Sequence, residues 1–337
     1  MANAMERQNV PEIQEVLSHW FTELPLKLSP LNGRSPNLGW LVEYANNRFV
    51  LKKCVRNHDH EWLHYLEDLT DALIRHRFPI QPMVLSKHHK RTVLQKGAFW
   101  QLRPFSEGRF YEMGNQADEQ EAIRVLKELH SLKDLPKGPK NPNCELKNWI
   151  SQPEKTLEHT ASALKMCVSS QKAVSLLREY EKQLEDVLLC LTPSLYDSLP
   201  HAVTHGDFHA GNLLMRNNRL CMVLDFDTAG YRPRIYDVAI SAYLLTRVKR
   251  GTFCLDLPRT VRFLSDYSQG FSVTENEWHS ISAFIKLLYL PTGRYLTLMH
   301  THVPHLLSWY IEWSFHALQS AAHQLKDGWY HKKGMTT

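Results

Sequence analysis

The residues best suited to chemistry stand in one stretch, residues 203–227, which reads VTHGDFHAGNLLMRNNRLCMVLDFD. Asp207 and Asn212 lie five positions apart on a glycine-containing loop, and Asp225 follows an apolar segment. A hairpin expected over 213–226 returns Asp225 toward that loop and holds its carboxylate at a sheet edge. The three side chains offer oxygen ligands, which Mg²⁺ prefers. We therefore expect phosphoryl transfer, in which metal ions bridge phosphates and a carboxylate accepts the proton of the attacking hydroxyl.

The order of these residues is also typical of kinases, where a catalytic Asp is followed five residues later by Asn and then by a metal-binding Asp before Phe. HGDFHAGN, followed by LDFD and Tyr236-Asp237, closely resembles the aminoglycoside phosphotransferase and choline kinase superfamily. Its members are small-molecule kinases with a protein-kinase-like fold, and they include homoserine kinase-like and spore coat kinase-like proteins. The resemblance runs from about residue 26 to about residue 250.

This resemblance implies a role for each residue of the stretch and implies ATP and Mg²⁺ as cofactors. Asp207 is the catalytic base, and Asn212 and Asp225 hold Mg²⁺. Four further residues support them: His205 braces the loop, His209 packs in the loop or contacts substrate, Asp227 lies beside the metal or its ligands, and Asp237 caps or braces the loop from the next helix.

A kinase also needs a strand lysine that holds phosphates and a helix glutamate that fixes this lysine. Residues 48–53, RFVLKK, resemble the strand that carries the lysine in the family, which makes Lys52 the candidate. Alternation along a strand points Lys53 to the opposite face, where it is expected to be exposed or to interact at the surface. Glu61 and Glu67 lie at opposite edges of the apolar stripe of the next helix. We favour Glu67 as the partner of Lys52 and keep Glu61 as the alternative.

Two further segments are expected to contact the nucleotide. Residues 102–108, LRPFSEG, resemble the family hinge where backbone groups meet adenine, so Arg103 and Phe105 are candidate cofactor-binding residues. The loop over 32–39 is expected to cover the phosphates, although it lacks GxGxxG. Within it, Asn37 is either a phosphate contact or a turn former.

The predicted elements define an α+β protein with the bilobal protein-kinase-like fold. A small β-rich N-terminal lobe with one key helix is expected over residues 1–105, and a larger, mostly helical C-terminal lobe over 106–337. Hydrophobic periodicity predicts strands at 26–31, 38–44, 48–54, 81–86, 91–96 and 99–105. It predicts helices at 10–22, 59–76, 117–133, 154–168, 172–191, 235–247, 258–270, 275–296 and 304–325.

Composition excludes several classes of protein. The chain has 337 residues, of which 43% are apolar and 22% charged, with a net charge of +5, as in ordinary globular proteins. The basic residues form no stripe interleaved with aromatics, which argues against nucleic-acid binding. We expect no membrane span and no secretory signal, and hence a cytoplasmic protein. Oligomeric state is not predicted.

The acceptor is expected to be a small hydroxylated molecule. Only twelve positions lead from Asp225 to Asp237, too few for the long activation segment of a protein kinase. Residues 285–325 hold one acidic residue, Glu312, which argues against a polycationic aminoglycoside and favours a neutral or zwitterionic compound. The predicted function is an ATP-dependent, aminoglycoside phosphotransferase-like transfer of the γ-phosphate to a hydroxyl. The alternative is a weakly catalytic or non-catalytic structural protein of the same fold, such as a spore-coat-associated protein.

Overall fold

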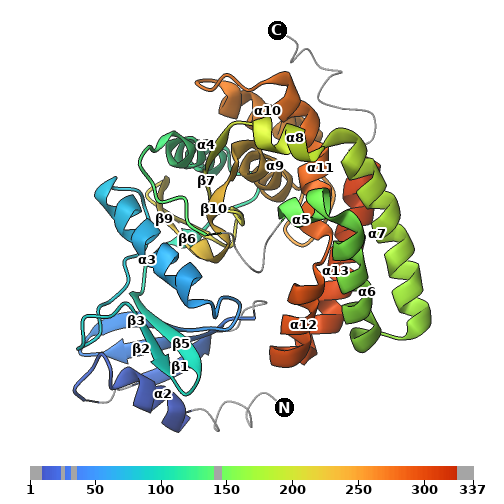
Figure 1. Ribbon diagram of the computed structural model, residues 1–337. Helices are drawn as coiled ribbons and strands as arrows, with labels where there is room; N and C mark the ends of the chain where they lie inside the picture. The colour runs from blue at the N-terminus through green and yellow to red at the C-terminus, as the bar shows by residue number, and fades with distance from the viewer. Residues whose placement is uncertain (1–9, 24–26, 32–35, 140–145, 325–337) are drawn as a thin grey trace. The chain divides into compact units, whose positions relative to one another are not determined.

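The computed structural model describes residues 10–23, 27–31, 36–139 and 146–324. The chain divides into two compact units, Met1–Glu107 and Gly108–Thr337, and this division falls two residues beyond the expected boundary at 105/106. Within the described residues, the first unit is built on an antiparallel sheet and the second is mostly helical (Figure 1). The predicted α+β class is confirmed.

The first unit contains a sheet of five strands in the order β1-β2-β3-β5-β4. These strands are β1 (Lys27–Leu31), β2 (Leu38–Tyr44), β3 (Asn47–Cys54), β4 (Thr92–Gln95) and β5 (Ala98–Pro104). The turn between β2 and β3 lies at Ala45 and Asn46. Ala45 and Asn46 have φ values of 46° and 64°, and Tyr44 pairs with Asn47. Positive φ at both central residues is the geometry that continues the twist of a hairpin.

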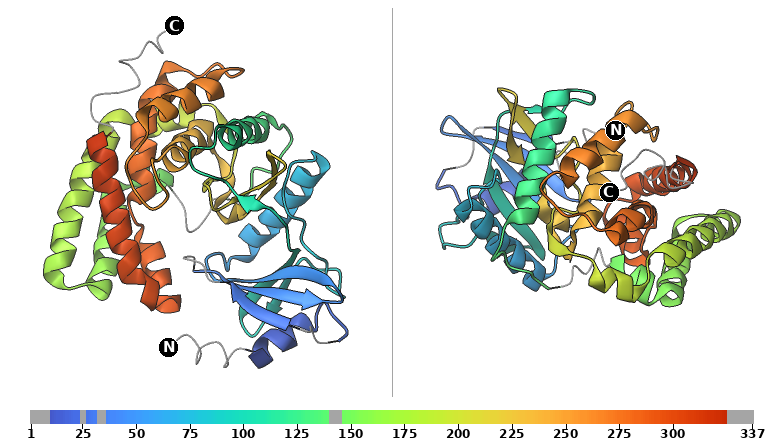
Figure 2. Two further views of the ribbon diagram at one scale, coloured as in Figure 1. Left: turned by 180° about the vertical axis from the view of Figure 1, so that it is seen from behind. Right: turned by 90° about the horizontal axis from the view of Figure 1, so that it is seen from above.

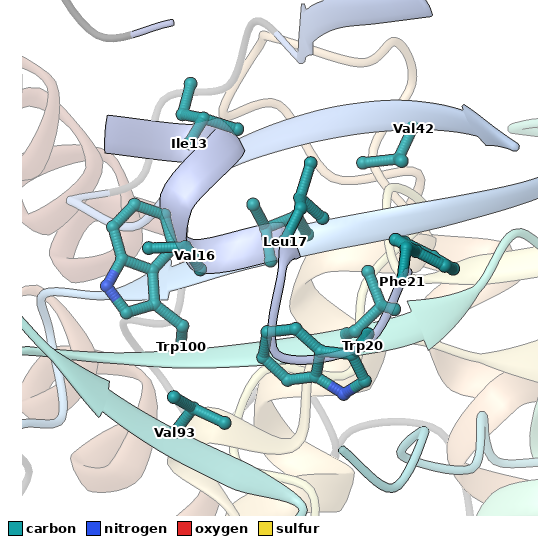
Figure 3. Close-up of a cluster of buried hydrophobic side chains, with 10 residues drawn as sticks. Ile13, Val16, Leu17, Trp20, Phe21, Val42, Val93 and Trp100 are labelled. Atoms are coloured by element: carbon teal, nitrogen blue, oxygen red, sulfur yellow. The ribbon is translucent and has the colours of Figure 1, made fainter. Parts of the chain in front are cut away.

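Helix α2 (Val10–Leu17) and the residues that follow it cover one face of this sheet (Figure 3). Ile13, Val16 and Leu17 are buried there against Val42 and Trp100 of the strands. The spacing of these apolar residues places them on one side of the helix, so that side packs on the sheet through apolar contacts. The predicted amphipathic helix is confirmed in type, although it ends at Leu17 rather than at residue 22.

The predicted strand at 81–86 is wrong. This segment forms only isolated backbone hydrogen bonds, such as the one that the Val84 N–H donates to the Leu102 carbonyl at 2.8 Å. Pro79 and Pro82 lack an N–H group, which prevents a regular ladder here. The Trp20 indole donates to the Val84 carbonyl at 3.0 Å and so fixes the segment by a side chain instead.

Helix α3 (His60–Arg75) follows the sheet strand β3 and matches the prediction for 59–76 closely. The Asp59 side chain caps its start by accepting from the Trp62 N–H at 2.8 Å. Its buried face contains Trp62, Leu66, Leu69 and Leu73, as the periodicity indicated.

The second unit combines helices with short strands. The helices are α4 (Gln116–Ser131), α5 (Leu146–Ser151), α6 (Pro153–Cys167), α7 (Ser170–Cys190), α8 (Pro193–Ser198), α9 (Arg234–Leu245), α10 (Leu257–Ser268), α11 (Glu275–Tyr289), α12 (Gly293–His302) and α13 (Pro304–Gln324). The strands are β6 (Arg109–Phe110), β7 (His201–Thr204), β8 (Leu213–Arg216), β9 (Arg219–Val223) and β10 (Gly230–Pro233). The sequence did not predict α5, α8, β6, β7 or β10 among them. Strands β8 and β9 form the predicted hairpin, and their turn residues Asn217 and Asn218 both have positive φ.

The single helix predicted over 275–296 is wrong, because α11 ends at Tyr289 and α12 begins at Gly293. Pro291 stands in the break, and Thr292 caps α12 by accepting from the Tyr295 N–H at 3.3 Å. A Cβ on Gly293 would lie 2.4 Å from the His159 carbonyl oxygen. The break therefore lets α12 pack against the backbone of α6.

Helix α9 is buried on all sides and lies at the centre of the second unit, where α11 packs against it. On one side of this unit, α6 and α7 lie beside α11, α12 and α13, as Figure 2 shows from behind and from above. In the part of the chain that is described, no helix combines the length and the apolar character needed to cross a membrane.

Candidate active site

The loop that holds the predicted base leaves strand β7 at Thr204 and enters strand β8 at Leu213. Gly206 has a φ of +80°, and a Cβ on it would lie 2.4 Å from the Thr228 carbonyl oxygen. Only glycine fits this backbone and this close approach. The sequence did not predict the pairing of β7 with β10. This pairing brings residues 204 and 230 opposite each other, and so it places the start of the loop beside the segment that follows Asp225.

Asp237, in the first turn of α9, binds the backbone at the start of this loop. Its carboxylate accepts from the backbone N–H groups of His205 at 2.6 Å and Gly206 at 2.7 Å. On the other side, His130 of α4 lies 3.3 Å from Asp237 and 2.8 Å from the Tyr267 hydroxyl. Burial alone would raise the pKa of Asp237, but the hydrogen bonds from His130 and the Gly206 N–H outweigh it, so this pKa lies below its usual value.

His205 connects the loop to the segment before Asp225. Its Nε2 lies 2.8 Å from the Leu224 carbonyl, and its Nδ1 accepts from the Asp207 N–H at 3.2 Å. These two contacts require the neutral ring with the proton on Nε2. The imidazole is fully buried, so it acts as an internal brace between the two chemically active segments.

Asp207 and Asn212 occupy neighbouring positions in the loop, as their spacing indicated. The Asn212 amide nitrogen donates to the Asp207 carbonyl at 2.9 Å, and the Leu224 N–H donates to the Asn212 carbonyl at 2.8 Å. Asn212 is 8% exposed, whereas the Asp207 side chain is 34% exposed. The carboxylate of the predicted base is thus accessible, while the amide beside it is fixed.

His209 lies against the carboxylate of Asp207, with 3.5 Å between Nε2 and Oδ2. Its Nδ1 accepts from the Gly211 N–H at 2.9 Å, which holds the ring within the loop. Burial lowers the pKa of His209, but the charges of Asp207 and Asp225 outweigh burial and raise this pKa above its usual value. The ring therefore combines the packing role that we expected with an electrostatic contact to Asp207.

Asp225 follows the β8–β9 hairpin and has an exposed side chain. Its φ of 57° lies in the left-handed region, which Asp tolerates better than most residues. The short 3-10 turn Phe226–Thr228 begins directly after it and buries Phe226 and Asp227. The left-handed backbone thus separates an exposed carboxylate at 225 from two buried side chains.

The donor set of this loop fits a hard divalent cation. The Asn212 amide nitrogen is engaged with the loop backbone, so its oxygen is the atom offered to a metal, and Asp225 adds an exposed carboxylate. Within the described residues, no group of three His, Cys, Asp or Glu side chains is arranged to hold a metal by itself. Mg²⁺ does not need one, because it takes one or two protein ligands and completes its shell with water and phosphate.

The predicted nucleotide-side residues lie in the first unit. Lys52 is on β3, opposite Gly39 of β2 and Gln101 of β5. Its neighbour Lys53 points to the face covered by α2, where it lies 3.0 Å from Glu12. Because side chains alternate along a strand, Lys52 points to the other face.

The two glutamates on α3 differ in burial. Glu67 lies at the edge of the buried face, with 19% of its side chain exposed, and it lies 3.8 Å from His64. Glu61 is exposed in the first turn. Glu67 thus keeps the more fixed position of the two, and its pairing with Lys52 stays a prediction.

The hinge candidates have defined contacts within the first unit. The Arg103 guanidinium donates to the Gln81 carbonyl at 2.8 Å, and the Phe105 N–H donates to the Arg48 carbonyl at 2.8 Å. The Arg48 guanidinium also lies over the Phe105 ring. The Asn37 side-chain amide oxygen accepts from the backbone N–H groups of residues 55 and 56 at 2.9 Å, so it joins the start of β2 to the residues that follow β3. Residues 32–35 of the expected phosphate-covering loop lie outside the described residues.

Sequence reasoning missed the roles of His130, Tyr267 and Thr228 in holding the loop. The Thr228 hydroxyl donates to the His205 carbonyl at 3.0 Å, and His130 links α10 to Asp237. The Leu129-His130 pair near the end of α4 was the signal in the sequence that could have pointed to His130, because a similar pair occurs in the family that the loop resembles. A hollow of about 700 Å³ in the described surface is lined by residues of α7, from Ser170 to Lys182, and contains no loop residue.

Comparison with known proteins agrees with the geometry of the loop. A sequence model of the phosphotransferase enzyme family (APH) matches residues 27–284. The chain belongs to this family. The resemblance inferred from the catalytic loop is thereby confirmed, and the protein is a small-molecule kinase-like phosphotransferase in class.

Among curated proteins, this phosphotransferase is similar to a homoserine kinase of Zymomonas mobilis subsp. mobilis. The two are 26% identical over 282 residues, which cover 80% of this chain and 82% of the relative. The match thus extends far beyond residues 203–227.

Solved structures of similar fold include kinases of several small molecules. A microcompartment-associated aminopropanol kinase has a TM-score of 0.67 at 18% identity and covers 95% of this chain and 99% of its own. The amicoumacin kinase hAmiN, in complex with AMP-PNP, Ca²⁺ and Ami, has a TM-score of 0.62 at 14% identity, with coverage of 93% and 95%. A thermostable mutant of aminoglycoside phosphotransferase APH(4)-Ia has a TM-score of 0.58 at 14% identity, with coverage of 92% and 99%. These likenesses confirm the protein-kinase-like fold.

Proposed function

We propose that this protein transfers the γ-phosphate of ATP to a hydroxyl group of a small molecule. The observation that carries the proposal is the loop in which Asn212 hydrogen-bonds the Asp207 backbone while Asp225 returns to the same loop through the β8–β9 hairpin. ATP is favoured because similar structures were determined with AMP-PNP or ADP.

In this proposal, Asp207 is the group that orients the acceptor hydroxyl and accepts its proton. Its carboxylate is accessible, and its backbone is held from both sides by His205 and Asn212. A base fixed in this way loses little entropy when the acceptor binds, which favours a productive geometry. His209 contacts this carboxylate, with 3.5 Å between Nε2 and Oδ2.

Asn212 and Asp225 would hold Mg²⁺, and Asp227 would support them from its buried position. When bound, the metal supplies neutralisation of the negative charge on the transferring phosphates. Lys52, fixed by Glu67, would hold the phosphates farther from the acceptor. The hinge residues Arg103 and Phe105 would lie near the adenine.

The acceptor class follows from charge and from the relatives. The only acidic residue among positions 285–325 is Glu312, and it lies 3.0 Å from Lys172, so it is engaged with a cation already. A polycationic acceptor would therefore find little negative charge on these helices. Since the similar proteins include a homoserine kinase and an aminopropanol kinase, small amino alcohols are the first acceptors to test.

The test is acceptor-dependent ADP release from Mg-ATP by the purified chain, with D207N as the control. The panel contains L-homoserine, 3-amino-1-propanol, choline, methylthioribose, a fructosamine and an aminoglycoside. We expect release with at least one acceptor and its loss in D207N. If Mg-ATP does not bind and no acceptor gives release, the protein is instead a structural member of the fold.

A further inference from the structure

A buried arginine lies just beyond the central helix of the second unit. Arg247 is 8% exposed, and its Nη1 donates to the Thr252 carbonyl at 2.9 Å. Its Nε has no hydrogen-bond partner in the described part of the chain, and no carboxylate there lies within ion-pair distance of it. Neighbouring buried cations differ, because Arg259 lies 3.0 Å from Glu119. A buried guanidinium without a counter-ion is costly, so a reason for its retention is needed.

A buried tyrosine hydroxyl in the same region also lacks a partner. Tyr289, the last residue of α11, is fully buried, and its hydroxyl makes no hydrogen bond to any described residue. Its ring packs edge-on against Tyr243 of α9 at 5.8 Å, one helical turn before Arg247. Unpaired polar atoms of this kind are rare in native interiors and point to a missing ligand or water.

Electrostatics connects this pair to the catalytic loop. Burial raises the pKa of the Tyr289 hydroxyl well above its usual value. The charges of Tyr243 and Asp207 raise it further, whereas Arg247 lowers it. The hydroxyl therefore stays protonated as a hydrogen-bond donor, and it lies within electrostatic range of both the proposed base and the buried cation.

We propose that Arg247 and Tyr289 bind an anionic group of the acceptor, so that the acceptor is a small hydroxylated acid. The proposal rests on the proposed function and names the substrate class of that same site. A carboxylate accepts from two donors at once, and here the donors would be the Arg247 Nε–H and the Tyr289 hydroxyl. The hydroxyl to be phosphorylated would then lie toward Asp207, a few bonds away from the carboxylate.

Half-buried aromatic side chains lie next to Tyr289. Trp313 of α13 packs edge-on against Tyr289 at 5.3 Å, and Trp309 stacks on Trp313 at 5.7 Å. An exposed second cation, Arg250, lies on the same loop as Arg247, and its guanidinium reaches within 3.1 Å of the place that a Cβ on Gly211 would take. Positive charge beside the catalytic loop favours the approach of an anion.

The decisive acceptors are L-homoserine and 3-amino-1-propanol, which differ only by a carboxylate. We expect kcat/KM for homoserine to exceed that for aminopropanol by about 10-fold or more, since hydrogen bonds to a charged group contribute this much. Y289F removes one hydroxyl and nothing else. It should lower kcat/KM for homoserine about 10-fold and leave aminopropanol within about 2-fold.

The matched control is Y180F on α7, whose hydroxyl is also buried but lies beside Ser314 of α13 instead of Arg247. Y180F should leave kcat/KM unchanged for both acceptors. Equal effects of Y289F on both acceptors, or no effect because water alone occupies the site, would overturn the proposal.

A second readout separates this proposal from the proposed function. Without nucleotide, 4-hydroxybutyrate should raise the Tm of the wild-type chain and should not raise that of R247M, whose folding is checked by circular dichroism. If the wild type shows neither a preference for the acceptor that carries a carboxylate nor this rise in Tm, the proposal of an anion site is wrong. Turnover of aminopropanol in that case would leave the kinase assignment intact, because only the carboxylate site would have failed.

Discussion

The catalytic loop of the second unit and the lysine-bearing sheet of the first unit position their chemistry in different ways. In the loop, polar groups hold the backbone directly, as when Asp237 accepts from the N–H groups of His205 and Gly206. On the sheet, Lys52 takes its direction from strand alternation, while an apolar cluster and Lys53 occupy the opposite face. Substitutions that strain the backbone should therefore destabilise the protein most in the loop. On the sheet, the effect of a substitution on turnover should depend on which face of the strand carries the side chain.

Two glycines with positive φ test the first half of this comparison. Gly206 has φ +80° and no room for a Cβ, whereas Gly97, in the β4–β5 turn, has φ +73° and nothing within 4 Å of an added Cβ. We expect G206A to lower the free energy of unfolding by about 3 kcal/mol or more, because strain and clash combine. G97A should lower the free energy of unfolding by only about 1 kcal/mol. Urea unfolding of both variants measures the difference, and equal losses would contradict the account of the loop.

Two adjacent lysines test the second half. K52M should lower kcat/KM about 100-fold by removing a phosphate ligand, with little change in Tm. K53M removes a partly exposed ion pair with Glu12 and a contact with the face of the Trp100 ring, and neither reaches the predicted phosphate site. It should leave turnover unchanged and lower the free energy of unfolding by only about 1 kcal/mol. Steady-state kinetics and thermal unfolding of the pair check this. Similar turnover in the two variants would remove Lys52 from the site.

Asp237 gives a pH-dependent test of how the loop is held. Because its folded-state pKa lies below its ordinary value, its ionised form stabilises the folded protein above about pH 4, and this contribution is lost as the pH falls through the folded-state pKa. D237N should lower the free energy of unfolding at neutral pH by about 2 kcal/mol.

D237N should also show a smaller acid-dependent loss of stability than the wild type. D197N is the control, since Asp197 forms an exposed pair with Lys147 and should matter little. Urea unfolding between about pH 6 and 3 measures both effects. An unchanged acid dependence in D237N would mean that the loop is held by other contacts.

Much of the fold could be predicted because its signals are local. The hairpin at Asn217-Asn218, the helix from His60 and the alternation at Lys52 each follow from a short stretch of sequence. The errors occurred where backbone chemistry interrupts a pattern. Pro291 divides α11 from α12 within a continuous apolar periodicity, and prolines on both sides of residue 80 prevent the strand expected at 81–86.

The candidate site divides in the same way. The spacing of Asp207, Asn212 and Asp225 identified the loop without any structure, because the order of these residues is itself the signal. The contacts of His130, Tyr289 and Arg247 could not be predicted, since they depend on how helices distant in sequence pack around α9. Burial of a polar group without a partner is visible only once that packing is known.

The most direct test of the account is transfer of the γ-phosphate from labelled ATP to the acceptor by the wild-type chain and by D207N. The account predicts a phosphate ester on the acceptor hydroxyl and a rate about 1,000-fold lower in D207N, with an unchanged Kd for Mg-ATP and an unchanged Tm. Near-normal transfer by D207N would contradict the assignment of Asp207 as the base, and with it the proposed mechanism.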